Sequence, residues 1–329
     1  MADLQLSIAC GDYDHIRDLT SGKVRAEGIT LLPSHLPVEE MFFRFTKFQA
    51  WDISEMSFAK AMAIVSQPNP WLALIPVFPS RAFRHSSIYV RSDRGIRTPA
   101  DLAGKKVGIP EWAQTAAIYS RGMLTSEYGV DLSSIDWYQA GVNEAGRREK
   151  VSLQLPSNIR YTPCPEHSLS GMLADGTLDA VLSARAPNVF FQNPHMVQRL
   201  FPDYRAAEWA YWKKTQVFPI MHVIALRREL YERHPWIVAN LMEGFEQAKQ
   251  RSLKRMADIT ASSVPLPWVS DYAEQSQQIM GADFWPYGIE ANRPTLDMFS
   301  RCAHQQGVTT RHMALEGIFV PEALERVKV

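Results

Sequence analysis

Ionisable side chains follow several predicted strands, at the positions where α/β proteins bind their ligands. The segments concerned are residues 11–17, 52–57, 79–86 and 218–222. They place arginines next to histidines, as in the run that holds Arg81, Arg84 and His85. An Arg guanidinium matches a carboxylate bidentately, and His titrates close to neutral pH. This combination indicates an anionic ligand that undergoes proton transfer.

Each of these side chains also has a purely structural interpretation. Arg81 and Arg84 could be solvated loop charges, and His85 and His222 could be hydrogen-bonded histidines of the core. Asp12 follows a glycine at a strand end, where Asx turns commonly form. Spacing alone does not decide between these interpretations and a functional site.

Glu55 is the carboxylate that most strongly suggests acid–base chemistry. It lies between Ile53 and Met56, so partial burial is expected, and burial shifts a carboxyl group toward general acid or base duty. Cys10 lies at the end of the first predicted strand and is interpreted as a small buried hydrophobe, not as a nucleophile.

A metal site has to be weighed because several side chains could supply ligands: Asp12, His15, Glu55, His85 and His222. The sequence contains no H-x-x-x-H or comparable pair, so no metal site is predicted, and a divalent metal stays open as an alternative. Glycine-rich phosphate loops and dinucleotide fingerprints are absent, which argues against nucleotide and nicotinamide cofactors.

The charge balance favours a small-molecule partner. The chain of 329 residues has 35 basic and 35 acidic side chains, so it has no basic excess for a nucleic acid or a membrane surface. The N-terminal residues are interpreted as a first strand and not as a signal peptide, and no stretch is apolar enough to span a membrane. We therefore expect a cytoplasmic protein whose three cysteines are reduced.

Short β-type runs alternate with helical segments, which predicts α/β architecture. The predicted strands are residues 4–10, 51–56, 72–78, 87–91, 106–109, 178–182 and 221–226. The predicted helices are residues 98–104, 115–128, 166–174, 235–256 and 294–304. In residues 235–256 the apolar positions recur at spacings of three and four, which indicates a long packed helix.

The length predicts two lobes, because 329 residues exceed the size at which one hydrophobic core usually stops growing. No flexible linker is evident, so the chain is expected to cross between the lobes twice. Residues 87–91 and 221–226 are the predicted crossing strands. Residues 1–91 and 220–329 would then form the first lobe, and residues 92–219 the second.

The same segments resemble the 4,5-dihydroxyphthalate decarboxylase family over nearly the whole chain. The resemblance includes Ala9–Asp14, Ser54–Ser57, Ile75–Ser86, Thr115–Ala117, Arg121–Leu124, Arg199–Asp203, Phe218–His222 and Trp285–Arg293. The string Phe-Pro-Ser-Arg-x-Phe-Arg-His is the most specific part. His15 departs from the family pattern, which often has Arg there, and this leaves a catalytic role for His15 in doubt.

The resemblance implies a type-2 periplasmic-binding-protein-like fold with a central cleft between its lobes. It also implies conversion of 4,5-dihydroxyphthalate to 3,4-dihydroxybenzoate and carbon dioxide, in a homo-oligomer. Protonation of the ring carbon that bears the carboxylate would give a dienone, whose carbonyl accepts the electrons when carbon dioxide leaves. The para hydroxyl makes this route available.

The reaction needs an acid at the ring carbon, a base at the hydroxyl and cations at the spectator carboxylate. The acid is assigned to His85 or His222 and the base to Glu55 or Asp12, while Arg81 and Arg84 would anchor the carboxylate. Further substrate contacts are expected from Tyr13, Ser57, Thr115 and Tyr287. The helix that begins near Thr115 would add N–H donors.

Two alternatives remain at this point. A solute-binding protein for an aromatic or other small carboxylate would share the fold but leave its ligand unchanged. Another enzyme on the same scaffold, acting on a related hydroxyphthalate, would share much of the site.

Overall fold

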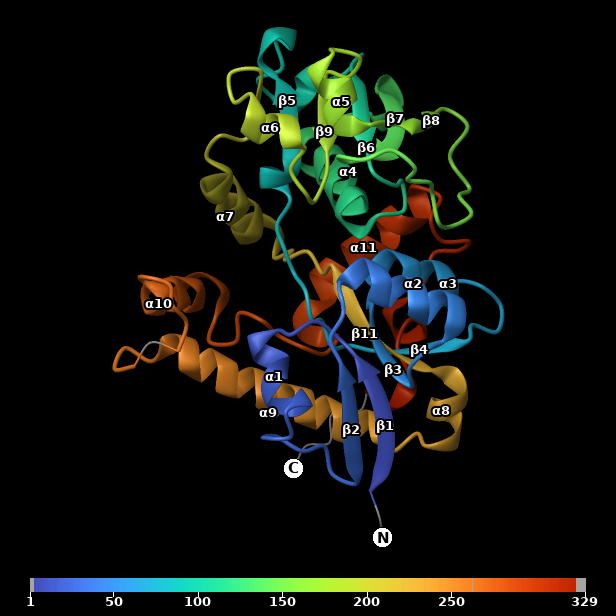
Figure 1. Ribbon diagram of the computed structural model, residues 1–329, viewed down its shortest axis with the longest axis vertical. Helices are drawn as coiled ribbons and strands as arrows, with labels where there is room; N and C mark the ends of the chain where they lie inside the picture. Colours follow the sequence, from blue (N-terminus) through green and yellow to red (C-terminus); the bar gives the residue numbers. More distant parts are fainter. Residues whose placement is uncertain (1–2, 262, 324–329) are drawn as a thin grey trace.

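The computed structural model describes residues 3–261 and 263–323, and it has two lobes that each surround one mixed β-sheet (Figure 1). The five-stranded sheet has the order β2-β1-β3-β11-β4, and the six-stranded sheet has the order β10-β5-β9-β6-β7-β8. The two-lobed α/β architecture expected from the sequence is therefore confirmed.

The first lobe holds the five-stranded sheet. Its strands are β1 (Leu4–Ala9), β2 (Ile29–Ser34), β3 (Ile53–Ser57), β4 (Leu72–Ile75) and β11 (His222–Arg227). Strand β1 pairs in parallel with β2 and β3, while β11 runs antiparallel to β3 and β4. The helices of this part are α1 (Asp14–Thr20), α2 (Val38–Phe48), α3 (Phe58–Val65), α8 (Arg228–Arg233), α9 (Ile237–Ala257) and α10 (Val269–Met280).

The second lobe holds the six-stranded sheet. Its strands are β5 (Ile88–Arg91), β6 (Lys106–Ile109), β7 (Asp136–Gly141), β8 (Arg160–Ser168), β9 (Ala180–Leu182) and β10 (Val197–Arg199). Its helices are α4 (Thr115–Tyr128), α5 (Leu169–Ala174), α6 (Asn188–Gln192) and α7 (Tyr204–Thr215). Helix α4 has the predicted bounds, and its C-cap Gly129 has φ +65°, a left-handed conformation that glycine adopts without strain.

Two segments cross between the sheets, and they meet at an isolated antiparallel bridge between Arg81 and Ile220. Strand β5 lies within the range predicted for the first lobe, yet it pairs with β9 and β10 of the second sheet. The first crossing therefore ends before Ile88. Strand β11 follows the second crossing directly and pairs within the first sheet.

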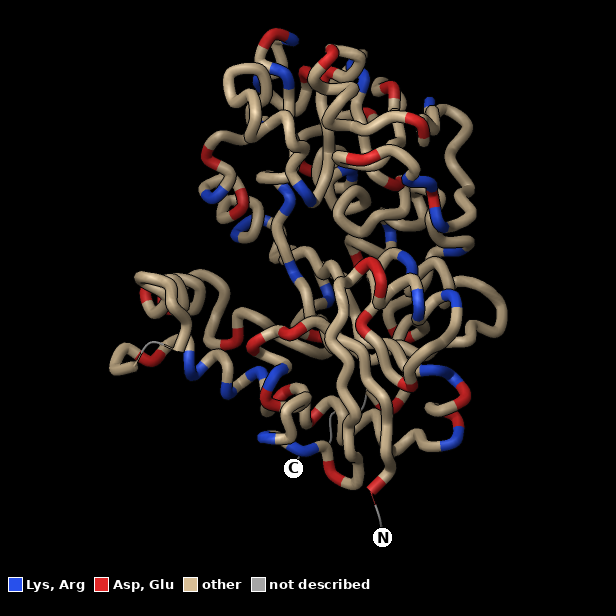
Figure 2. Tube along the Cα trace, viewed as in Figure 1, with Lys and Arg blue, Asp and Glu red and all other residues tan. Residues whose placement is uncertain are grey.

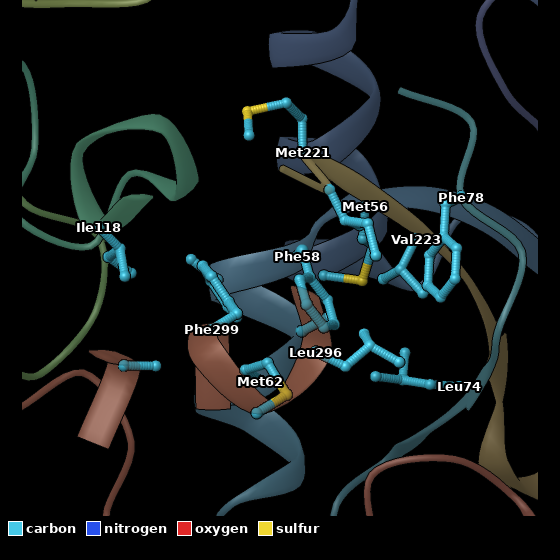
Figure 3. Packing of buried hydrophobic residues seen from close by; sticks show 14 of the residues in the cluster. Met56, Phe58, Met62, Leu74, Phe78, Ile118, Met221, Val223, Leu296 and Phe299 are labelled. Carbon is cyan, nitrogen blue, oxygen red and sulfur yellow. The ribbon is translucent and has the colours of Figure 1, made fainter. Parts of the chain in front are cut away.

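Helix α11 (Arg293–Gln305) packs against both lobes. Phe299 stacks on Phe58 of α3 with ring centroids 4.6 Å apart, and it contacts the Tyr119 ring of α4 at 4.8 Å. Figure 3 shows this apolar packing, where Leu296 and Phe299 face Phe58 and Met62. Helix α11 thus makes a third connection between the lobes, one the sequence did not predict.

The predicted long helix forms as α9, and the side chains of its expected apolar stripe are buried: Ile237, Leu241, Phe245, Ala248 and Ser252. All three cysteines are free thiols. Among the described residues, no helix is both long and apolar enough to span a membrane. Lys, Arg, Asp and Glu are intermixed over both lobes (Figure 2).

Candidate active site

A cavity of about 290 Å³ lies between the lobes. From the first lobe and the crossing segments, its lining includes Val38, Glu39, Phe42, Ser57, Lys60, Ser80, Arg84, Met221 and His222. From the second lobe, it includes Glu111, Gln114, Thr115, Ala116, Val142, Arg147, Lys150, Ser183, Ala184 and Arg185. Five cationic side chains and only two carboxylates line the cavity, so it suits an anionic ligand.

His222 and Glu55 form a hydrogen-bonded pair on neighbouring antiparallel strands. The Nδ1 atom of His222 lies 2.5 Å from Oε1 of Glu55, whose side chain is fully buried. The strand register brings them together, because His222 pairs with Ser57 and Ile224 with Glu55. With Nδ1 held by the carboxylate, Nε2 is the ring nitrogen left for the cavity.

Glu55 is ionised despite its burial. Burial alone would raise its pKa, but the pKa lies below the usual value because His222, the Gly11 N–H and the Tyr13 hydroxyl all interact with the carboxylate. Gly11 N and Tyr13 Oη each donate to it at 2.8 Å. The carboxylate oxygens are thus occupied by protein donors, and Glu55 orients His222 instead of reaching the substrate.

Arg84 lines the cavity without a carboxylate partner among the described residues. Its Nε lies 3.2 Å from Sδ of Met221, the residue next to His222. Burial lowers the pKa of Arg84 to about 10, so the side chain is still cationic at neutral pH. Glu208 acts on Arg84 electrostatically but makes no ion pair with it, so the charge of Arg84 is available to a ligand carboxylate.

The beginning of helix α4 forms part of the opposite wall. Thr115 Oγ1 lies 3.0 Å from Ser57 Oγ and accepts a hydrogen bond from the Ala59 N–H at 3.0 Å, so it links the two lobes. Gln114, just before the helix, offers no side-chain cap. The first N–H groups of this helix are therefore available to an anion.

Two polar atoms of the lining have no hydrogen-bond partner among the described residues. They are Oγ of Ser183, which is only 3% exposed, and Oε1 of Gln114. Buried polar groups are normally paired, so these atoms indicate positions for polar groups of a ligand.

Arg81 does not line the cavity. It donates to the carbonyl oxygens of Phe218 at 3.2 Å and Pro286 at 2.6 Å, and to Asn292 Oδ1. These contacts hold a crossing segment to the C-terminal part of the chain. Arg81 thus has a packing role in this structure, with Nη1 and Nη2 bonded within the protein and Nε without a partner among the described residues, and the anchoring role expected for it stays a prediction.

His85 also lies away from the cavity lining. It is 1% exposed, its ring is surrounded by those of Tyr128, Phe201 and Tyr211, and neither ring nitrogen has a partner among the described residues. Burial lowers its pKa to about 4. The structure therefore favours His222 over His85 as the acid.

Three other predicted side chains lie outside the lining. Asp12 is exposed and bonded to Arg17 at 2.8 Å, so it is not placed to act as a base. Tyr287 is buried, with its ring 4.9 Å from Nζ of Lys249. Tyr13 acts indirectly through Glu55, whereas Ser57 and Thr115 line the cavity as expected.

His15 packs between aromatic rings, and its Nε2 lies 3.0 Å from the Pro79 carbonyl oxygen. Within residues 3–261 and 263–323, no three His, Cys, Asp or Glu side chains group as a metal site would require. Of the candidate ligands, only Glu55 and His222 are in contact.

The sequence did not predict the cationic side chains that the second lobe contributes to the cavity. Arg147 and Lys150 lie in an irregular segment between β7 and β8, and Arg185 follows β9. No motif marks them. Lys60 is in the first turn of α3, three residues after Ser57. That spacing could have indicated that Lys60 lies on the same side of the helix as Ser57.

No family model matches the chain. The chain is 40% identical over its full length to the 4,5-dihydroxyphthalate decarboxylase of Comamonas testosteroni, all of which is covered. It is 42% identical to the Pseudomonas putida protein of the same name, over 64% of this chain and 82% of that protein. This chain belongs to the 4,5-dihydroxyphthalate decarboxylase family. The resemblance seen in the sequence is thus confirmed.

Solved structures similar to this decarboxylase-family chain support the binding-protein fold. A sulfonate-binding protein from Methylobacillus flagellatus, described as putative, gives a TM-score of 0.57 at 14% identity, with 98% of this chain and 94% of that chain covered. The alkanesulfonate-binding protein of Xanthomonas axonopodis gives 0.51 at 12% identity, with 97% and 99% covered. At these identities the likeness concerns the fold alone.

Proposed function

We propose that this protein removes carbon dioxide from 4,5-dihydroxyphthalate to give 3,4-dihydroxybenzoate. Family membership supports the reaction. The observation that carries it is the buried Glu55–His222 pair beside Arg84, in a cavity rich in positive charge. An aromatic dicarboxylate matches such a cavity in charge, and a ring acid–base reaction matches the oriented imidazole.

In this proposal His222 is the general acid. Its Nε2–H delivers the proton to the substrate ring carbon that bears the leaving carboxylate. Ionised Glu55 contacts the other imidazole nitrogen, Nδ1, and acts as a counter-charge. A positioned acid of this kind contributes ~10²–10⁴-fold to the rate. The carbon–carbon bond electrons then return to the ring as carbon dioxide departs.

Arg84 and the beginning of α4 hold the carboxylate end of the substrate. Arg84 lies on the same side of the cavity as Met221 and His222, so a carboxylate bound to it would be next to the reacting carbon. The α4 N–H groups and Ser183 Oγ supply neutral donors from the other lobe. Arg81 does not line the cavity and supports the crossing segment through its hydrogen bonds to Phe218, Pro286 and Asn292.

The test is incubation of purified protein with 4,5-dihydroxyphthalate in D₂O. We expect carbon dioxide and 3,4-dihydroxybenzoate with one deuterium on the carbon that carried the carboxylate. His222→Asn should abolish this conversion, and His85→Phe serves as the matched control. Recovery of unaltered diacid by wild-type protein would contradict the proposal and favour a solute-binding function.

A cytoplasmic location and a homo-oligomeric state also remain proposals. Size-exclusion chromatography with light scattering measures the oligomeric state directly, and a monomer at all concentrations would contradict a homo-oligomer. Activity after treatment with a chelator tests the open alternative of a divalent metal.

A further inference from the structure

The proposed function leaves one position of the reaction without a side chain. The hydroxyl para to the leaving carboxylate has to lose its proton, yet Glu55 is occupied by His222 and Asp12 is outside the cavity. The inference below rests on the proposed function and concerns this hydroxyl end of the ring.

Glu111 organises a cluster of cations in the cavity wall. It follows β6, and its side chain is 2% exposed. Nε and Nη2 of Arg147 lie 2.9 and 2.7 Å from its Oε1, and Lys150 Nζ lies 3.4 Å from the same oxygen. One buried carboxylate therefore holds two cations of the second lobe at the cavity.

Lys60 completes the cluster from the opposite lobe. Its Nζ lies 4.0 Å from Oε2 of Glu111, and its side chain is 16% exposed. Because Lys60 is on α3 of the first lobe and Glu111 follows β6 of the second, the cluster is complete only when the lobes are together. It joins the same cavity as His222 and Arg84.

The cluster carries surplus positive charge. The other carboxylate nearby, Glu149, does not line the cavity, accepts hydrogen bonds from the N–H groups of Trp112 and Ala113, and has a pKa raised by burial and by Glu111. It also interacts electrostatically with buried Arg121. With Lys60 protonated, three cations face Glu111 and Glu149, so an anionic ligand atom would restore the balance.

We propose that Lys60, Arg147 and Lys150 form the subsite for the ring hydroxyls, where they stabilise the phenolate and Lys60 exchanges the hydroxyl proton. Arg84 beside Met221 and His222 marks the carboxylate end of the cavity. The reacting hydroxyl is para to the leaving carboxylate, so it lies at the far end of the ring. The Glu111 cluster lines the same cavity, and among the described residues it makes no ion pair or hydrogen bond with Arg84 or His222.

The proton transfers balance with Lys60 as the base. Neutral Lys60 takes the hydroxyl proton while His222 protonates the ring carbon, which gives the dienone. Loss of carbon dioxide returns the bond electrons to the carbonyl oxygen, and Lys60 gives its proton back to that oxygen. His222 regains one proton from solvent, the net proton that the reaction consumes.

The surroundings of Lys60 favour the neutral amine. Burial lowers the pKa of Lys60 most, Glu111 and Glu149 oppose this effect, and Lys150 and Arg147 add to it. These four side chains have the largest electrostatic effects on it. Because its pKa is lowered, a larger fraction of Lys60 is the neutral amine that can accept a proton than in an exposed lysine.

The experiment uses the product, 3,4-dihydroxybenzoate, as a spectroscopic probe, because catechol and catecholate absorb differently. Bound to wild-type protein, its hydroxyl should ionise at least about tenfold more readily than in water. Arg147→Met and Lys150→Met should each reverse this by about threefold or more. Lys23→Met, an exposed residue outside the cavity, is the matched control.

Phthalate, which lacks hydroxyls, provides the second measurement. Its dissociation constant should be unchanged in Arg147→Met and Lys150→Met but raised in Arg84→Met. Equal weakening of phthalate in the cluster variants would overturn the proposal, since the cluster would then hold a carboxylate. Ionisation of the bound probe as in water would overturn it as well.

Lys60→Arg separates charge from proton transfer. It should keep the spectral shift of the bound probe and lose turnover by ~10²-fold or more. Full turnover in this variant would remove Lys60 as the base. Because probe binding needs no turnover, absence of decarboxylation in wild-type protein with an intact spectral shift would reject the proposed function and not this subsite.

Discussion

Glu55 decides which nitrogen of His222 faces the cavity. A buried carboxylate at 2.5 Å from Nδ1 requires a proton there, so Nε2 is left to act on a ligand. Glu55 itself is fixed by Gly11 and Tyr13. The orientation of the proposed acid thus depends on contacts outside the cavity lining.

Replacing Glu55 should therefore damage catalysis more than binding. We expect Glu55→Gln to lower kcat by ~10²-fold or more, because the amide can stabilise the wrong tautomer and provides no counter-charge. The dissociation constant for phthalate should change little. Steady-state kinetics measure kcat, and the inhibition constant of phthalate measures its binding. An unchanged kcat would contradict the orienting role.

His85 should contribute to stability and its pH dependence. Its folded-state pKa is about 4, below the usual 6.5, so the unfolded chain binds more protons between those values. Its neutral form is favoured above about pH 6.5, and this stability is lost progressively as the pH falls toward 4. At about 1.4 kcal/mol per pKa unit, the effect is at most about 3.5 kcal/mol.

His85→Phe should consequently flatten the pH dependence of unfolding between pH 6.5 and 4 while kcat stays near normal. Urea denaturation across this range measures the free energy of unfolding, and the decarboxylase assay measures kcat. A well-folded variant that loses turnover ~10²-fold would restore His85 as a candidate acid.

At the scale of elements, the alternation of β-type runs and helical patterns predicted the α/β fold and the bounds of α4. Strands β2, β7, β8 and β10 were not predicted. In β8 two prolines, Pro163 and Pro165, obscure the pattern, and such residues suit an edge strand. β2 and β10 are also edge strands, where one side is unpaired and the hydrophobic pattern is weaker.

The candidate site was predicted in part for a related reason. Side chains at strand ends, such as Ser57 and His222, follow from the order of elements. The distinction between His85 and His222 does not, because neither the Arg84 before His85 nor the Met221 before His222 indicates which ring will meet a carboxylate. Only tertiary packing places His222 against the Glu55 carboxylate and surrounds His85 with aromatic side chains.

Arg81 illustrates an element-scale role for a residue that looked like a ligand. Its guanidinium ties the crossing segment to Pro286 and Asn292, so Arg81→Met should lower the unfolding free energy by about 2–4 kcal/mol. Substrate binding by the folded fraction should change little. Chemical denaturation and the KM of the variant test this; a large rise in KM at unchanged stability would contradict it.

At the scale of the whole molecule, the lobes are held together by contacts around the cavity. Thr115 binds Ser57 and Ala59, and Arg185 pairs with Glu39 at 2.6 Å. Both lobes line the cavity, so these contacts set the separation of its two walls.

Weakening this closure should affect binding and release. We expect Thr115→Val to raise KM several-fold and to increase the radius of gyration of the liganded protein, because the valine methyl group cannot bind Ser57 or Ala59. Small-angle X-ray scattering with and without phthalate measures the second effect. Identical scattering and KM would show that closure does not depend on this contact.

Helix α11 restricts how the two lobes can move relative to each other. Gly122 of α4 lies so close to it that a methyl group there would come within 2.7 Å of Cys302, while Phe299 stacks on α3. Because α11 packs against both lobes, the two lobes are not expected to separate equally on all sides of the cavity. We expect the lobes to open by rotation about α11, which would widen the cavity most on the side farthest from that helix.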